Sequence, residues 1–166
     1  MSPHPRSPAL AKYLAAALLC LWAAACASPR SSYAAEEIEK WEATGNTALS
    51  VTGNVTFTSS KIAFQSGAAF PLASAGHVKD FKAMGESVDA AVYRVTTPAD
   101  PALKNGNHLC GSGTRTRSVS YIAIWKPEAL PGDKSPRAMA AFSSKDEPHA
   151  AGGPDFCGIY NYDSDK

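Results

Sequence analysis

Through much of the chain, apolar and polar residues alternate with a period of two, which is the pattern of half-buried β-strands. Turn residues such as Ser59-Ser60 and Asn105-Gly106 separate several of the alternating segments. Short strands joined by tight turns predict an antiparallel meander, because parallel neighbours need long crossovers. The expected strands cover residues 47–58 (with Gly53-Asn54 as a bend or a tight turn), 62–64, 67–72, 87–96, 119–125, 138–142 and 156–162.

Two segments have the spacing of helices instead. Residues 34–43 contain good helix formers, with Ile38 and Trp41 three apart on one face. Residues 73–86 place Val78, Phe81 and Met84 three apart, and Gly85 would end that helix. One or two short helices are therefore expected.

Together these elements predict a mainly β fold of about eight strands, with one or two short helices. The strands would form a small antiparallel β-barrel or a strongly curved sheet, because closure protects strand edges. Pro71 places the strand over 67–72 at an edge, since proline donates no ladder hydrogen bond. The alternative is an α+β sandwich, with the helix over 73–86 packed across an open sheet.

The N-terminus has the pattern of an export signal. Arg6 and Lys12 precede a run of apolar or small residues over 13–25, which is too short to span a bilayer. Residues 23–26, Ala-Ala-Ala-Cys, resemble a bacterial lipobox, which predicts a lipid on Cys26; the alternative is ordinary cleavage before Ser28. The expected organisation is a signal peptide over 1–25, a linker and short helix over 26–46, and a single β-rich domain over 47–166.

Export places the protein in the bacterial periplasm or, if lipidated, on the cell envelope, with no membrane contact beyond the anchor. Loss of residues 1–25 leaves 14 basic against 15 acidic residues. This near-neutral balance gives no broad attraction to nucleic acid or to a membrane surface, so a partner must be recognised by local complementarity. The even pair Cys110 and Cys157 predicts one disulfide in an oxidising compartment.

No reaction is indicated by the side chains. His77, His108 and His149 lack a metal-ligand spacing, and no Gly-x-Ser-x-Gly nucleophile elbow is present. We therefore expect no metal, no cofactor and no enzyme activity. The alternative is a small periplasmic hydrolase that uses a loop serine and a histidine.

Two groups of residues are candidates for ligand or partner contacts. Arg115 and Arg117 flank Thr116 after a glycine-rich turn, and paired guanidinium groups suit an anionic ligand or an acidic partner surface. Trp125 and Tyr160 belong to a C-terminal aromatic group that could line a ligand cavity in a barrel or simply form the core. The remaining members of that group are Phe142, Phe156 and Tyr162.

Three features of the sequence resemble those of known proteins. The strand-rich order and late disulfide resemble small exported barrels of the lipocalin-like (calycin) kind. Residues 73–76, Ala-Ser-Ala-Gly, are similar to the Ser-Ala-Ser-Gly segment of membrane-bound inhibitors of c-type lysozyme, which are lipoproteins with a compact barrel. The Leu-Cys-Gly at 109–111 and the Cys-Gly-Ile-Tyr at 157–160 resemble the ending of many uncharacterised proteobacterial periplasmic proteins. This last resemblance implies location and fold, and no reaction.

The leading hypothesis is a non-enzymatic cell-envelope binding protein. Its partner would be a small apolar ligand in the barrel, or a protein contacting the loops around residues 111–117 and 147–155. An inhibitor of a lysozyme or another hydrolase is the main alternative.

Overall fold

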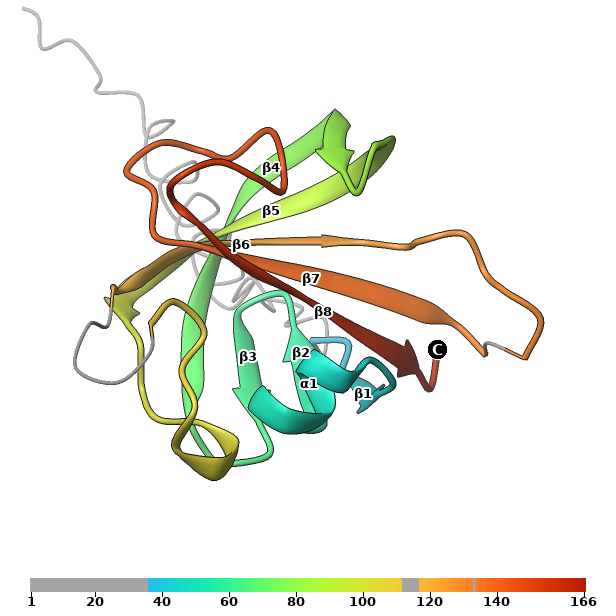
Figure 1. The fold of residues 1–166 in the computed structure, drawn as a ribbon, viewed down its shortest axis with the longest axis horizontal. Helices are drawn as coiled ribbons and strands as arrows, with labels where there is room; N and C mark the ends of the chain where they lie inside the picture. The colour runs from blue at the N-terminus through green and yellow to red at the C-terminus, as the bar shows by residue number, and fades with distance from the viewer. Residues whose placement is uncertain (1–35, 112–116, 133) are drawn as a thin grey trace, which may run out of the picture. The chain divides into compact units, whose positions relative to one another are not determined.

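The computed structural model describes residues 36–111, 117–132 and 134–166. In this part of the chain, eight antiparallel strands follow one another in chain order, and β1 pairs with β8 to close a barrel (Figure 1). The predicted mainly β barrel is confirmed, and the alternatives of an open curved sheet and of a sandwich are wrong. The strands are β1 (Glu39–Ala43), β2 (Val55–Thr58), β3 (Lys61–Phe64), β4 (Ala69–Ala83), β5 (Glu86–Ala99), β6 (Val119–Trp125), β7 (Pro136–Phe142) and β8 (Phe156–Ser164).

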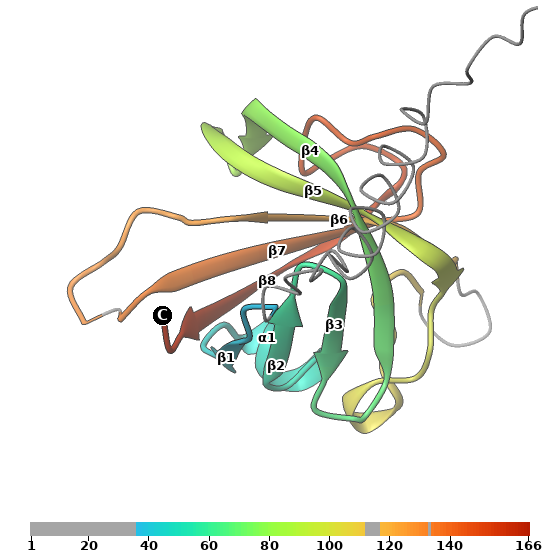
Figure 2. The same cartoon turned by 180° about the vertical axis from the view of Figure 1, so that it is seen from behind.

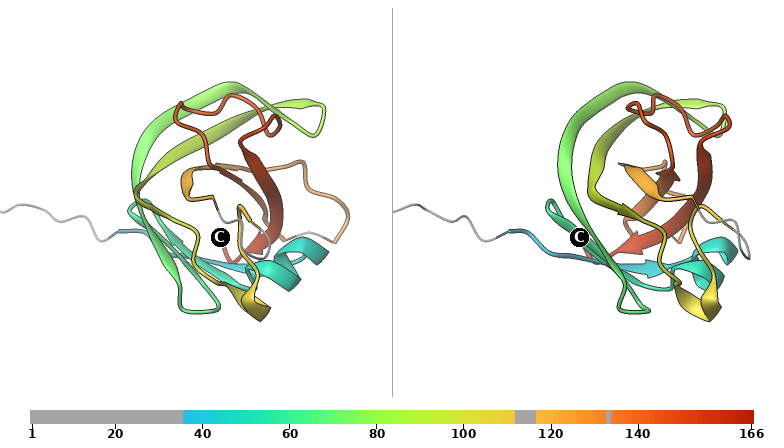
Figure 3. Two further views of the ribbon diagram at one scale, coloured as in Figure 1. Left: turned by 60° about the vertical axis from the view of Figure 1, so that its left-hand side comes forward. Right: turned by 90° about the vertical axis from the view of Figure 1, so that its left-hand side faces the viewer.

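The strands pack their side chains into two separate hydrophobic cores, one on each face of the sheet. On β6, Ile122 and Ile124 belong to one core, whereas Ala123 and Trp125 belong to the other, because successive strand residues point to opposite faces. The first core draws residues from all eight strands, so it fills the interior of the barrel. The second lies on the outer face of β6 and β7, under the far end of β4, which curves around one side of the barrel (Figure 3).

The two ends of the barrel are built differently. At one end, α1 (Asn46–Val51) connects β1 to β2, and the 3₁₀-helix η1 (Lys104–Gly106) lies next to it. The opposite end, called here the barrel mouth, is where β1, β5 and β7 begin and β2 and β6 end (Figure 2). Glu36, the first described residue, is bound at the mouth, because its carboxylate accepts hydrogen bonds from Ser59 and Ser60 in the β2–β3 turn.

In the first part of the domain, a strand and a helix form where the sequence pattern predicted the opposite. The helix predicted over 34–43 is wrong for its described residues: β1 occupies Glu39–Ala43, and Trp41 is buried between strand neighbours while Ile38 is exposed. The first half of the strand predicted over 47–58 is wrong as well, because α1 forms there. Gly53, at φ +61°, changes the chain direction between α1 and β2. Within the described residues, no helix is both long and apolar enough to cross a membrane.

The helix predicted over 73–86 is also wrong, since this segment belongs to β4 and its turn. Val78 pairs with Ala90 and Phe81 with Val88, so β4 has one more residue than β5 between these pairs. The extra residue is a β-bulge, which lets two side chains three apart share one face. The bulge therefore imitates helical spacing in the sequence. Met84 stands in the hairpin turn and is exposed.

Pro71 does not mark a sheet edge, because β4 has neighbours on both sides. It pairs with Lys61 of β3, and the ladder to β5 begins one residue later, at Leu72 opposite Val95. Its missing N–H therefore falls just outside the second ladder, where no hydrogen bond is lost.

Two buried tyrosines in β8 lead to a prediction on alkaline stability. Burial is the main cause that raises the pKa of both Tyr160 and Tyr162 well above the ordinary value; the charge of Asp100 adds to it for Tyr160, and a hydrogen bond to Thr52 partly opposes it for Tyr162. Above about pH 10 the unfolded chain loses these protons while the folded chain keeps them. The free energy of unfolding should then fall by about 1.4 kcal/mol per pH unit for each tyrosine.

Urea unfolding at pH 9, 10 and 11 measures this slope. A variant with Tyr160→Phe and Tyr162→Phe should show a flatter dependence over the same range. An equal slope in both proteins would contradict the assignment to these two groups.

Candidate functional site

The Cys110–Cys157 disulfide joins the segment after η1 to the start of β8 and confirms the predicted pairing. The two Cα atoms are 4.6 Å apart, although 47 positions separate them in sequence. The carboxylate of Asp100 fixes the first cysteine, because it accepts hydrogen bonds from the backbone N–H groups of Leu109 at 2.9 Å and of Cys110 at 3.0 Å. In the barrel interior, the Tyr160 hydroxyl donates a hydrogen bond to the Leu109 carbonyl at 3.3 Å.

This disulfide places Gly111 close to the end of the connection between β7 and β8. Gly111 leads from Cys110 into residues 112–116, and residues 143–155, called here the β7–β8 loop, end shortly before Cys157. Arg117 connects the two segments: its Nη1 donates to the Pro154 carbonyl at 2.7 Å and lies 3.9 Å from Oδ1 of Asp155. Arg117, at the end of the first segment predicted to contact a partner, therefore lies against Pro154 and Asp155 of the second.

The β7–β8 loop is held at its base and at its middle. At the base, the N–H of Ser143 donates to the carbonyl of Asp155 at 2.9 Å. In the middle, the loop pairs with β4: the N–H of Lys82 donates to the His149 carbonyl at 3.1 Å, and the Lys82 carbonyl accepts from the N–H of Ala151 at 2.7 Å. The loop therefore presents a defined surface.

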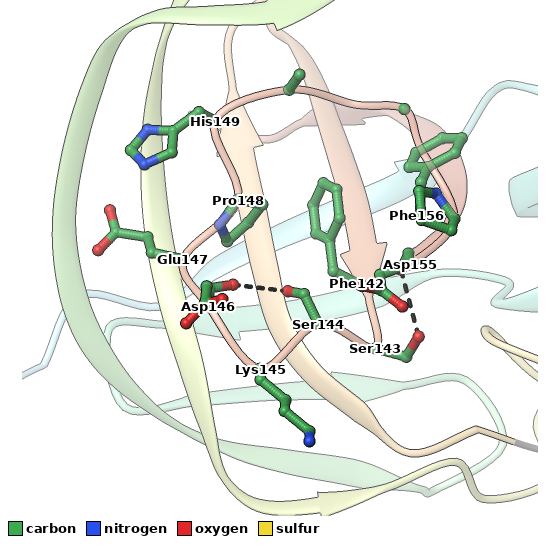
Figure 4. Close-up of a pocket in the computed structure, with 13 residues that line it drawn as sticks. Phe142, Ser143, Ser144, Lys145, Asp146, Glu147, Pro148, His149, Asp155 and Phe156 are labelled. Carbon is green, nitrogen blue, oxygen red and sulfur yellow. Dashed lines mark hydrogen bonds between the residues drawn. The ribbon is translucent and has the colours of Figure 1, made fainter.

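A hollow of about 550 Å³ lies within the β7–β8 loop. Figure 4 shows the ring of Phe142 on the inner side of the loop, and Phe156 lies beside it with ring centroids 5.8 Å apart. Lys145, Glu147 and His149 project outward from the rim (Figure 4). The hollow thus combines an apolar floor with a polar and charged rim.

A second depression, of about 530 Å³, runs beside the base of this loop. Arg94 of β5, Arg117 and Lys145 line it, and it is called here the cationic groove. Among the described residues that line it, Asp155 is the single carboxylate. Arg94 and Lys145 form no ion pair with any residue of the described chain. The groove therefore carries positive charge that the described residues do not neutralise.

The other described residues that the sequence predicted as ligand or partner contacts do not line the cationic groove. Trp125 is 5% exposed in the outer core, with its ring 5.7 Å from that of Phe81, and it also borders a pocket at the barrel mouth. Tyr160 is buried in the inner core. Arg115 and Cys26 lie outside the described residues. Of the four predicted contacts, Arg117 is the one that the structure places in the cationic groove.

Sequence reasoning missed Arg94 and Lys145. The signal for Arg94 was present, because it stands between Tyr93 and Val95, which belong to the inner face, and so must point outward. Lys145 had no comparable signal, since its position depends on the path of a long loop.

Chemically, the cationic groove offers positive charge and hydrogen-bond donors, whereas the hollow of the β7–β8 loop is also lined by the carboxylates of Asp146 and Glu147. In residues 36–111, 117–132 and 134–166, no three His, Cys, Asp or Glu side chains lie close enough together to hold a metal ion. In the same residues no serine or threonine hydroxyl is hydrogen-bonded to a histidine: His77 faces Asp89, and His108 faces the Asp100 carbonyl. The arrangement therefore suits recognition of an anionic group.

Comparison of the chain with protein-family models, with curated proteins and with solved structures finds no match. The case for function consequently rests on the geometry of the site.

Proposed function

We propose that this chain is a non-enzymatic binding protein, exported to the cell envelope, that recognises an acidic surface of a partner protein with its cationic groove and the β7–β8 loop. The observation that carries the proposal is the disulfide, which joins Cys110 to Cys157, shortly after the end of the β7–β8 loop, with their Cα atoms 4.6 Å apart. A loop that is already ordered loses little conformational entropy on binding. The disulfide is also compatible with an oxidising compartment.

Charge supports an anionic partner. Arg94, Arg117 and Lys145 bring three cations to the groove against the one carboxylate of Asp155. Guanidinium groups bind carboxylates through paired hydrogen bonds, and complementary charge accelerates encounter. Because the exported chain is close to neutral overall, this attraction is local to the groove.

Inhibition of a hydrolase is the alternative form of this binding. The braced β7–β8 loop favours it, because a rigid loop can enter a cleft without a large ordering cost. The full chain, added in excess to a panel of lysozymes and proteases, decides the point: slowing of one enzyme supports inhibition, and unchanged rates throughout remove that alternative.

Binding of the purified full chain to poly-L-glutamate at low salt tests the proposed recognition. A triple variant with Arg94→Gln, Arg117→Gln and Lys145→Gln should bind at least 10-fold more weakly than the wild type. The matched control carries Lys61→Gln, Lys79→Gln and Lys134→Gln, which remove three exposed lysines elsewhere on the domain. We expect less than a 2-fold change in the control.

Equal weakening in both variants would show that net charge alone is responsible and would overturn the proposal. So would a groove variant that binds like the wild type. A 20-base-pair DNA duplex is included as a competitor; tighter binding to DNA than to poly-L-glutamate would replace the protein partner by a nucleic acid.

A further inference from the structure

The barrel mouth carries a pocket of about 530 Å³, separate from the cationic groove. Trp41 and Phe57 form its floor, stacked with ring centroids 5.0 Å apart and almost fully buried. Tyr93 packs edge-on against Phe57 at 5.5 Å, and it is only partly buried, as is Ala91 next to it on the same face of β5. The volume lies in the range of small-molecule sites, and the exposed wall is apolar and aromatic.

A charged pair lies at the edge of this floor and leaves one acceptor unused. The Arg137 guanidinium is 5% exposed, and it donates to the Glu39 carboxylate at 3.1 Å, to Ser135 and to the carbonyl of Lys166 at 2.8 Å. Oε2 of Glu39 accepts from Arg137, from Trp41 Nε1 and from Ser164. Oε1 of Glu39 accepts nothing from the described residues. Since no buried side-chain oxygen among those residues lacks a partner, Oε1 is open to solvent.

The unsatisfied polar groups of the pocket therefore favour a donor in the ligand. Each nitrogen of the Arg137 guanidinium already donates at least one hydrogen bond within the domain, whereas Glu39 lines the pocket with a free carboxylate oxygen and is 23% exposed. The Tyr93 hydroxyl has no hydrogen-bond partner among the described residues, and burial, together with the charge of Glu39, raises its pKa, so it stays protonated at neutral pH. The hydroxyl can donate or accept.

At the rim, the remaining charged groups are solvated. His77 lies 3.1 Å from Asp89, and both side chains are more than half exposed. Lys126 is also exposed, and among the described residues it has no ion-pair partner. Solvated rim charges contribute little to affinity, so the buried floor sets the preference.

We propose that the barrel-mouth pocket binds a small amphipathic molecule whose ring-sized apolar body lies against Tyr93 and Phe57 and whose head group donates hydrogen bonds to Glu39. A primary ammonium or a hydroxyl meets this requirement, and a carboxylate does not. The site is independent of the cationic groove, so either proposal can fail without the other.

Three probes with one shared ring test the head-group chemistry: 2-(1-naphthyl)ethylamine, 2-(1-naphthyl)ethanol and 3-(1-naphthyl)propanoate. Titration of the full chain, followed by NMR, should show the amine and the alcohol binding at least 5-fold more tightly than the carboxylate. Intermolecular NOEs should connect the naphthyl protons to the ring of Tyr93. A carboxylate that binds as tightly as the other two, or NOEs to another part of the domain, would overturn the proposal.

A pocket-filling variant tests the location. Ala91→Leu adds three carbons to a side chain that borders the pocket, and it should weaken binding of the amine at least 10-fold. The matched control is Ala75→Leu, at an exposed position of β4 that does not line the pocket. Unchanged affinity in the Ala91 variant would contradict the site; if that variant does not fold, the NOEs in the wild type decide the location.

Discussion

Removal of the Cys110–Cys157 disulfide is expected to lower the free energy of unfolding by about 4 kcal/mol. The bond closes a loop of about 48 residues, and in the chain-entropy model a cross-link of this span restricts the unfolded chain by that amount. For a domain of this size the melting temperature should fall by about 15 °C. Thermal and urea unfolding of the Cys110→Ala/Cys157→Ala double variant measure both quantities.

The single variants provide the control. Cys110→Ala and Cys157→Ala each remove the same bond, so each should lose nearly as much as the double variant. Losses that add up in the double variant would mean that the cysteines act separately. The double variant should also bind poly-L-glutamate more weakly, because Arg117 and the β7–β8 loop lose their fixed relation although no cation has been removed.

The second large effect is expected at the pair Glu39–Arg137. Arg137→Met removes a buried guanidinium that also holds the Lys166 carbonyl, and it leaves the Glu39 carboxylate without its counter-charge. Breaking one side of such a pair costs about 3 kcal/mol; this is the low end of the usual range because the Glu39 side chain is 23% exposed. Urea unfolding at pH 7 measures the loss.

A double-mutant cycle separates the pair from its surroundings. Glu39→Gln combined with Arg137→Met should cost clearly less than the sum of the two single changes, because the remaining charge is removed together with its partner. Arg117→Met is the matched control: this half-exposed arginine forms a long surface pair and one exposed hydrogen bond to the Pro154 carbonyl, and their loss should cost about 1 kcal/mol. Additive losses in the cycle would contradict a coupled pair.

The C-terminal half of the fold was predictable because its strands are regular. Strand β6 has the bounds expected from its pattern, and β7 and β8 extend those expected by two residues. The predictions failed where tertiary pairing overrides a local signal. Trp41 is drawn into a strand by its stack with Phe57, and the bulge between Val78 and Phe81 gives β4 the spacing of a helix.

The site was predictable only in pieces. Arg117, the two cysteines and the β7–β8 loop were all indicated by the sequence, and the structure adds that they adjoin one another. Their proximity depends on the closure of the barrel and on the pairing of Lys82 with the β7–β8 loop. Neither feature can be read from the local pattern of apolar and polar residues. Arg94 joins them from a strand about 20 positions earlier than Arg117 in the sequence.

The point at which the chain enters the barrel sets how the domain would be presented on a membrane. Glu36 is bound at the barrel mouth, so any tether attached before it pulls from that end. A lipid on Cys26, as the sequence predicts, would leave nine residues between the anchor and Glu36, a span of at most about 35 Å when extended. The barrel mouth would then be the end of the domain nearer to the lipid. The cationic groove lies toward the opposite end, where molecules arriving from solution could reach it.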